Sequence, residues 1–256
     1  MADPLYSSLW DGLSPHLLAT FYEVKRDGNG QWGRSEESDP TIVIAPLIEA
    51  NMELTMGWQS PFEGSDMDGK APTLMAMLQS GELQAVIGAS GAESDSGQIN
   101  QTLNQFIGRS GITKLNSTQT FSGMAPVRMQ VTAQLRAWRD PVSEVENPFN
   151  KLMEWALPVD IAEDGPVLAR ILETGYNAIT SGDADAITAL MPSQSPTHIA
   201  MHYKGRTYKP LVIESIGHPI SSPVNKDGKF IELAVPMTLA TLTAIDRQDW
   251  VDTVSR

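Results

Sequence analysis

The sequence of 256 residues contains no cysteine. This absence excludes disulfide bonds, thiol catalysis and every metal site that depends on cysteine ligands. The sequence also lacks any run of the roughly 18 apolar residues that a helix needs to cross a bilayer. Residues 1–17 carry neither a basic leader nor an apolar core, so nothing there indicates a signal peptide. We therefore expect the fold to be stabilised by packing or by association with other chains.

Basic residues are scarce. The chain has 18 Lys and Arg against 31 Asp and Glu, which gives a formal net charge of −13. Proteins that grip nucleic acid do so with clustered Lys and Arg, so this composition argues against DNA binding. An acidic surface can still serve DNA by repelling it from a wall along which it slides. Plain solubility is the alternative interpretation of the same charge.

The order of the predicted elements is β-rich, then helical, then β-rich, which is typical of an α+β fold. Hydrophobic residues make up 41% of the chain and charged residues 19%, as in ordinary globular proteins. We expect an N-terminal arm or hairpin over 1–40 and a β domain built from 41–140 and 197–256. Residues 141–196 are predicted to form a helical insertion between the two parts of that domain.

The periodicity of the chain changes abruptly near Pro141. Residues 129–138 alternate between apolar and polar side chains, which is typical of a strand with one buried face. Residues 141–157 instead place their apolar side chains at steps of three and four, which predicts a helix. Asp140 is a suitable N-cap, Pro141 fits the first turn, and Pro158 ends the helix.

Other segments show weaker patterns of the same two kinds. Strands are predicted within 40–62 and over 230–245, where apolar and polar side chains alternate. Short helices are predicted over 71–83 and 101–111, and further helical sequence lies within 160–192.

Glycine-rich and acidic loops do not complete any known motif. The loop that begins at Gly88 lacks the last glycine of G-x-S-x-G and the second glycine of G-x-G-x-x-G. The loop that begins at Asp27 resembles the start of an EF-hand, but Trp32 occupies the position that requires glycine. Residues 65–70 lack the downstream glutamate. All three segments are interpreted as turns or surface loops.

Candidate metal ligands and carboxylate pairs are also weak. His198 and His202 lie four apart in a segment that alternates like a strand, which separates them by about 13 Å, too far to share an ion. The pairs Glu144 with Glu146 and Asp183 with Asp185 have the chemistry of a general acid and base. Both pairs lie in polar stretches where solvated carboxylates are expected. We predict no catalytic residue, no metal and no cofactor.

Two longer segments carry a resemblance to a known group of proteins. They are "FSGMAPVRMQVTAQLRAWRDPVSEVENPFNKLMEWALP" and "YKGRTYKPLVIESIGHPISSPVNKDGKFIELAVPMTLATLTAIDRQDW". They resemble baseplate and tube-associated structural proteins of contractile-tailed bacteriophages, including tube-initiator, LysM-adaptor and ripcord-like components. The resemblance covers about 90 of the 256 residues, and no LysM repeat is evident.

The resemblance implies a tail-tube-like β-barrel or sandwich core with an inserted helical segment, in a ring around a central channel. It implies a virion component that links tail tube or sheath to the baseplate, is assembled in the host cytoplasm, and has other tail proteins as partners. The ring is expected to be a hexamer of identical chains, through which DNA passes without being bound. No membrane insertion is expected.

The strands 127–138 and 230–245 are long and amphipathic, so we expect their edges to pair with a neighbouring copy. The helix after Pro141 has a wide apolar side, part of which is expected to dock another tail component. The alternative is that this whole side packs on the chain's own sheet. The predicted interface residues are Trp138, Val142, Val145, Phe149, Leu152, Trp155, Leu233, Val235, Met237 and Leu239.

Two rival functions remain open from the sequence. A wall-degrading tail hydrolase would use a carboxylate pair such as Glu144 and Glu146. A neck component such as a tail terminator would share the ring architecture but lie at the other end of the tube.

Overall fold

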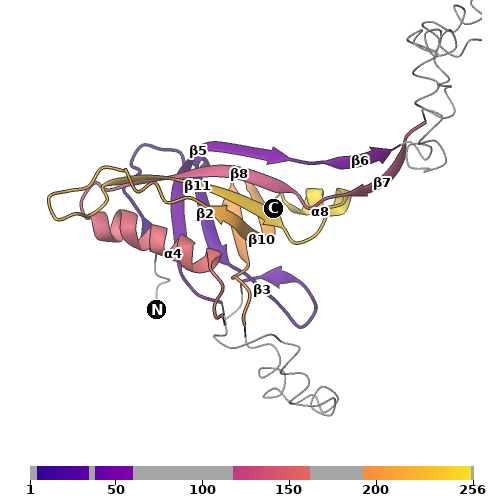
Figure 1. Ribbon diagram of the computed structural model, residues 1–256, viewed down its shortest axis with the longest axis horizontal. Helices are drawn as coiled ribbons and strands as arrows, with labels where there is room; N and C mark the ends of the chain where they lie inside the picture. Colours follow the sequence, from indigo (N-terminus) through magenta and orange to yellow (C-terminus); the bar gives the residue numbers. More distant parts are fainter. Residues whose placement is uncertain (1–4, 35–37, 60–117, 162–192, 255–256) are drawn as a thin grey trace, which may run out of the picture. The chain divides into compact units, whose positions relative to one another are not determined.

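The computed structural model describes residues 5–34, 38–59, 118–161 and 193–254 (Figure 1). The chain divides into two compact units. The first, called the body here, comprises Met1–Thr55 and Ala125–Arg256, and the second, called the arm, comprises Met56–Met124. The helices predicted over 71–83, 101–111 and 160–192 lie outside the described residues.

The body contains a mixed sheet of seven strands among its described residues. In chain order the strands are β1 (Leu5–Ser7), β2 (Leu18–Glu23), β5 (Ile42–Glu53), β8 (Arg128–Arg136), β9 (Ile199–Tyr203), β10 (Arg206–Ile216) and β11 (Glu232–Thr241). Their spatial order is β1-β5-β2-β9-β10-β11-β8, and an additional β5–β8 pairing joins the last strand to β5. Strands β5, β2, β9, β10, β11 and β8 are thus hydrogen-bonded in a ring. β1 lies outside this ring and pairs with β5 in parallel.

Apolar and polar side chains alternate along these strands, so that one face of the sheet is buried and forms the core. On β8, Met129, Val131, Ala133 and Leu135 are buried, while Arg128, Gln130 and Arg136 are exposed. β11 alternates in the same way, and its register places Leu233 opposite Leu135 and Leu239 opposite Met129. Cross-strand apolar pairs of this kind stabilise a sheet and fix its register.

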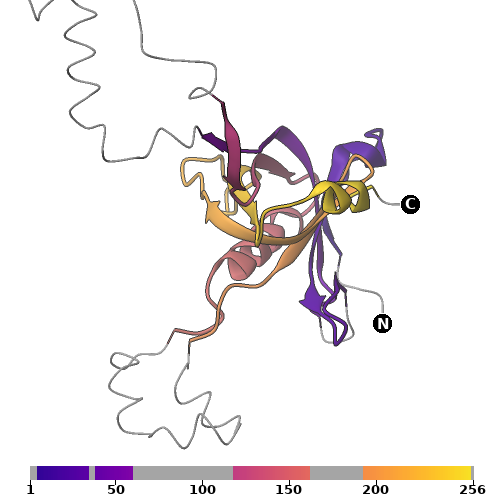
Figure 2. The ribbon, with the colours of Figure 1, turned by 90° about the vertical axis from the view of Figure 1, so that its right-hand side faces the viewer.

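One helical segment covers the concave side of the sheet. It begins as a π-helix (η3, Val142–Glu146) and continues as α4 (Asn147–Ala156). In Figure 1 α4 lies along the sheet, and in Figure 2, turned by 90°, it is seen nearly end-on with strands above it. Its buried side chains include Phe149, Leu152 and Trp155, which belong to the same core as the strands. The prediction of a helix between Pro141 and Pro158 is confirmed.

The π-helical start has a local cause that the periodicity did not indicate. Pro148 has no N–H, so the carbonyl of Glu144 loses its helical donor four residues on. The Asn147 N–H instead donates to the carbonyl of Val142, five residues back. A π-type turn accommodates the change before regular helix resumes.

Smaller elements surround the closed sheet. A 3-10 turn (η1, Pro15–Leu17) precedes β2, and β3 (Lys25–Arg26) pairs with β4 (Trp32–Gly33) in a hairpin. A short helix (α8, Arg247–Asp252) lies near the end of the chain. In the arm, β6 (Met56–Gln59) pairs with β7 (Thr120–Met124).

The α+β class predicted from the sequence is confirmed, with strands from both ends of the chain in one sheet. The expectation that the strands within 127–138 and 230–245 keep edges open for sister copies is wrong. β8 and β11 pair with each other along nearly their whole length. β11 also pairs with β10, and β8 with the second half of β5. The chain uses these edges itself to close its sheet.

Candidate functional site

The predicted interface residues fall into two groups. Trp138 is 57% exposed and Val142 is 37% exposed, both at the junction between β8 and the helix. The other eight lie in the core of the body, namely Val145, Phe149, Leu152, Trp155, Leu233, Val235, Met237 and Leu239. The helix therefore packs its apolar side on its own sheet. A neighbouring protein can reach only the first group without opening the core.

The junction that carries Trp138 is held by two carboxylates. Glu144 is buried and accepts the backbone N–H groups of Trp138 at 2.5 Å and Arg139 at 3.0 Å. Hydrogen bonds from the Ser143 side chain and from the N–H groups of Ser143 and Val142 lower the pKa of the Asp140 carboxyl. The Arg136 guanidinium lies 4.7 Å from the centre of the Trp138 ring. These contacts fix an aromatic side chain at the surface.

A free strand edge lies on the second half of β5. Residues 42–46 pair with β2, and residues 47–53 pair with β8. β1 covers the remaining edge of the first half through residues 42–44. No strand in the described part of the chain covers the remaining edge of residues 47–53. Ile48, at the irregularity in the β8 pairing between Leu47 and Glu49, is 59% exposed.

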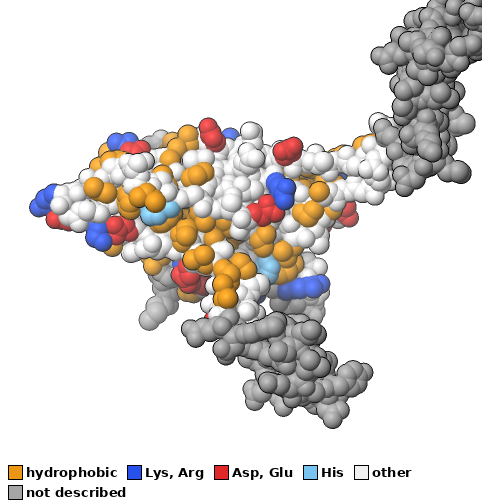
Figure 3. All heavy atoms as spheres, viewed as in Figure 1, with side chains coloured by type: hydrophobic (Ala, Val, Ile, Leu, Met, Phe, Trp, Pro, Cys, Tyr) orange, Lys and Arg blue, Asp and Glu red, His pale blue; other side chains and the backbone are white. Residues whose placement is uncertain are grey.

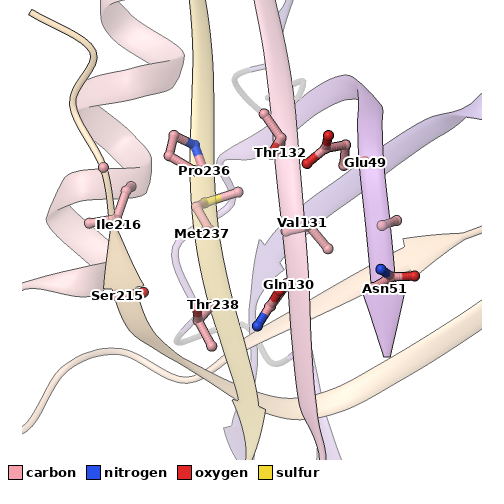
Figure 4. A pocket seen from close by; sticks show the side chains of 12 residues that line it. Glu49, Asn51, Gln130, Val131, Thr132, Ser215, Ile216, Pro236, Met237 and Thr238 are labelled. Atoms are coloured by element: carbon pink, nitrogen blue, oxygen red, sulfur yellow. The ribbon is translucent and has the colours of Figure 1, made fainter. Parts of the chain in front are cut away.

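A shallow depression of about 730 Å³ lies on the outer face of the sheet (Figure 4). It spans four neighbouring strands, β5, β8, β11 and β10. Its polar side chains are Glu49, Asn51, Gln130, Thr132, Ser215 and Thr238. None of these six forms a side-chain hydrogen bond or ion pair within the described residues. The depression can therefore offer hydrogen bonds to a neighbouring molecule.

The arm presents an apolar face that the sequence analysis did not identify. Cross-strand register places Met56 opposite Met124 and Trp58 opposite Phe121. The Trp58 and Phe121 rings are 5.4 Å apart, edge to face, and the two side chains are 53% and 54% exposed. The opposite face of the same ribbon carries Gly57, Gln59 and Thr120. Large apolar side chains that stay exposed side by side indicate a contact surface.

Part of the signal for this face was present in the sequence. Met56 and Trp58 alternate with glycine and glutamine, whereas Phe121 and Met124 lie three residues apart and show no such alternation. The two segments lie more than sixty residues apart, so neither segment alone showed that they pair. Elsewhere, hydrophobic side chains also gather on the face of the body seen in Figure 3.

The candidate carboxylates of the hydrolase hypothesis are engaged in other contacts. Glu144 binds backbone N–H groups, and Glu146 forms an ion pair with Lys229 at 3.0 Å. The second candidate pair, Asp183 and Asp185, lies outside the described residues.

The candidate metal ligands do not converge where the structure describes them. His202 makes a hydrogen bond to Thr207 at 2.9 Å, and the His198 ring packs against Trp32 with centroids 4.9 Å apart. Burial lowers the pKa of His198. Asp27 accepts backbone N–H groups within its own turn. Among the described residues no group of three or more His, Asp or Glu side chains is placed to hold a metal ion. The loops at Gly88 and 65–70 lie outside those residues.

Comparison with protein-family models and with curated proteins gives no match for this chain. No helix within the described residues is long and apolar enough to span a membrane.

Proposed function

We propose that this chain is a structural subunit of a contractile phage tail, joining tube or sheath to the baseplate as part of a ring around the channel. In this proposal the chain has a structural role: it forms part of a ring, provides contact surfaces for neighbouring proteins and leaves the central channel open. The resemblance of residues 121–158 and 203–250 to baseplate and tube-associated proteins suggests this assignment, including a ring of six copies and a tail-tube-like core.

The observation that carries the proposal is the second edge of β5 at residues 47–53, which no strand in the described part of the chain covers. Unpaired backbone N–H and C=O groups along a strand are a template for pairing with another chain. Residues 47–53 have such an edge over seven residues, and the side chain of Ile48 within this stretch is exposed. β8 and β11 pair with each other along nearly their whole length, whereas one edge of residues 47–53 is covered by no described strand, so we assign the contact with a neighbour to β5. Strand addition at this edge supplies backbone hydrogen bonds between subunits.

The arm and the β8–helix junction supply further contact surfaces. Trp58 and Phe121 form an exposed aromatic pair, and Trp138 is held at the surface by the Glu144 contacts. Aromatic side chains with fixed orientation are frequent anchors of protein interfaces. We assign them to contacts with neighbouring tail proteins.

The net charge fits a passage for DNA. Six copies carry a formal charge of 6 × −13 = −78. Acidic groups that face a channel repel phosphate, so that DNA moves through without being held. In this proposal DNA is a passing cargo and never a ligand.

Electron microscopy of the virion tests the proposal. Antibodies against this chain should label the tail at the baseplate end, and a reconstruction should show six copies in one ring with β5 paired to a neighbour. Antibody labelling at the neck would instead support the role of a tail terminator. A chain found outside every ring, or a purified chain that degrades peptidoglycan, would refute the structural role.

A matched pair of variants tests the β5 edge in solution. Ile48→Lys places a charge beside the free edge, which blocks strand addition without affecting the core. Lys226→Ala changes an exposed residue in the turn before β11 and serves as the control. We expect tails assembled with the first variant to lack this ring, while the control assembles normally. Both chains should unfold at the same urea concentration as the parent.

A further inference from the structure

The last described residues form a segment, Asp246–Val254, that we call the C-terminal strap. It contains α8 and is attached to the body at two consecutive residues of β10. The Thr207 N–H donates to the carbonyl of Thr253 at 2.7 Å. Arg206 donates to Thr253 Oγ1 at 2.8 Å, and its guanidinium lies 4.5 Å from the centre of the Trp250 ring.

The strap covers an edge that the sheet leaves open. β9 pairs with β10 on one side through Arg206 and Thr207. On the other side β11 reaches only as far as Leu211 of β10. Beyond that point the bridge between Arg206 and Val254 puts the strap where the next strand would be. Removing it exposes the backbone edge at Arg206 and Thr207, the start of the stretch of β10 that β11 does not reach.

The strap holds its own shape and makes few contacts with the body. Asp246 and Asp249 cap the helix reciprocally, each accepting the backbone N–H of the other at 2.8 and 2.9 Å. No residue of α8 is buried. A space of about 600 Å³ lies between the strap and the side chains of Tyr22, Thr207 and Lys209. A segment with so little buried area opens at low free-energy cost.

The charges of the strap and of the edge below it are complementary. The strap carries Asp246, Asp249 and Asp252 against one basic residue, Arg247. The chain at the start of β10, residues 204–209, carries Lys204, Arg206 and Lys209 and no acidic residue. An acidic segment is therefore the kind of occupant that this edge accepts.

We propose that the strap is a displaceable cover, and that the edge beneath it receives the free edge of β5 from a second copy of this chain. Residues 47–53 carry Glu49 and Glu53 and no basic residue, so they match the basic edge as the strap does. The seven residues of β5 whose second edge no described strand covers are also more than the two residues that the strap covers. The inference rests on the self-assembly part of the proposed function and names the two surfaces that meet.

The pairing of two different edges has a geometric consequence. Each copy offers β5 to one neighbour and β10 to the other, which is a head-to-tail contact that closes into a ring when the rotation per subunit fits. While the strap is seated, the β10 edge is occupied and the ring cannot close. The strap thus holds a free subunit as a monomer until assembly displaces it.

Hydrogen exchange of the full chain tests the cover. Arg206→Ala removes the contacts to Trp250 and Thr253, so the amide of Thr207 should exchange roughly tenfold faster than in the parent. Arg247→Ala removes the same charge from the strap itself, where no contact with the body depends on it, and should leave that amide unchanged. Equal exchange of the Thr207 amide in all three chains would overturn the cover.

Mass measurement in solution tests the occupant. A chain that ends at Ile245 should self-associate where the full chain is monomeric, and Arg206→Ala should do so to a smaller degree. Adding Glu49→Lys to the shortened chain should abolish association, and adding Lys209→Glu as well should restore it. A shortened chain in which the Thr207 amide exchanges rapidly yet which stays monomeric would overturn the choice of a second copy as the occupant.

The two proposals fail separately. Circular dichroism of the shortened chain establishes that it is folded, and Arg206→Ala serves as the test variant if it is not. Loss of the charge-reversal rescue counts against the β5–β10 contact alone. Absence of the chain from the virion tail counts against the proposed function, whatever the strap does in solution.

Discussion

Lys151 Nζ lies 2.5 Å from Asp39 Oδ2 and 2.8 Å from Glu154 Oε2, and it joins α4 to the segment that leads into β5. The lysine is almost fully buried. Its ammonium group also lies 5.8 Å from the centre of the Trp155 ring. A buried charge is tolerated only when it is paired, so these contacts fix the position of the helix relative to the start of β5.

This ion pair makes stability depend on pH at both ends of the scale. Burial alone would raise the pKa of Asp39, but hydrogen bonds from Lys151 and Thr41, with the lysine charge, lower it to about 2. The unfolded value is about 3.9, so the stabilisation is present above about pH 4 and is lost as the pH falls toward 2. Burial would lower the pKa of Lys151, but Asp39 and Glu154 raise it. That contribution is lost as the pH rises through this raised value.

Asp39→Asn should remove the acid part of this dependence. We expect it to cost about 1 kcal/mol at neutral pH, because the partly exposed carboxylate is screened by solvent. Urea unfolding measured from neutral pH down to about pH 2 should show a smaller loss of stability in the variant than in the parent. Parallel curves for the two chains would contradict the assignment. Asp27→Asn, in an exposed turn, serves as a control.

Glu144 and Glu146 should differ sharply although they are two residues apart. Glu144→Ala leaves the N–H groups of Trp138 and Arg139 without their acceptor, which we expect to cost about 1–3 kcal/mol. Glu144→Gln should cost less, because the amide oxygen can still accept. Glu146→Gln loses only a surface ion pair with Lys229, worth less than about 1 kcal/mol. Thermal unfolding of the three variants gives the comparison, and equal effects at both positions would exclude the capping role.

Gly217 should tolerate no side chain. A Cβ there would lie 2.7 Å from Cγ of Pro236, and the Gly217 N–H donates to the carbonyl of the same proline at 2.8 Å. Gly217→Ala should therefore cost about 1–3 kcal/mol through strain between β10 and β11. Gly28→Ala meets no atom within 4 Å and is the matched control. Chemical denaturation of both variants measures the difference. A neutral effect at Gly217 would mean that the two strands separate easily.

The predicted interface residues should separate into two classes by their effect on stability. Leu152→Ala and Leu233→Ala remove fully buried side chains and should each cost about 2–5 kcal/mol. Trp138→Ala should change stability by less than about 1 kcal/mol, because it loses only a surface contact with Arg136. Its effect should appear instead in co-purification with the tail proteins that the proposed function names as partners. A large stability loss at Trp138 would place it with the core residues.

Local patterns predicted the elements better than their partners. The alternation around Val131 and the three-and-four spacing around Leu152 identified a strand and a helix, and both are present. Both patterns mark a buried face, yet neither states whether that face is covered by the same chain or by another. Leu233 and Val235 were predicted to lie at an interface with another chain. The sequence could not separate that from burial in the chain's own core, because both kinds of burial give the same apolar pattern.

Edge pairing was harder still to predict. Whether a strand edge is free depends on the register of strands far apart in the sequence, such as Leu47 opposite Ala133. The sequence contains no local mark of that register. For the same reason the free edge of β5 and the strap over Arg206 became visible only in the folded chain. The resemblance to tail proteins supplied the assembly hypothesis, and the structure relocated the surfaces through which it would operate.

The β5–β8 pairing also has a consequence for how this polypeptide tolerates change. Glu53 and Arg128 are directly opposite each other, so the main chain leaves the closed sheet and returns to it at adjacent positions. The two ends of any segment that connects Glu53 to Arg128 therefore lie one strand spacing apart, about 5 Å. A two-residue reverse turn could bridge that gap as well as a long insert. The closed sheet should accordingly accept deletion or exchange of the intervening sequence, which makes this point a suitable insertion site for a foreign domain.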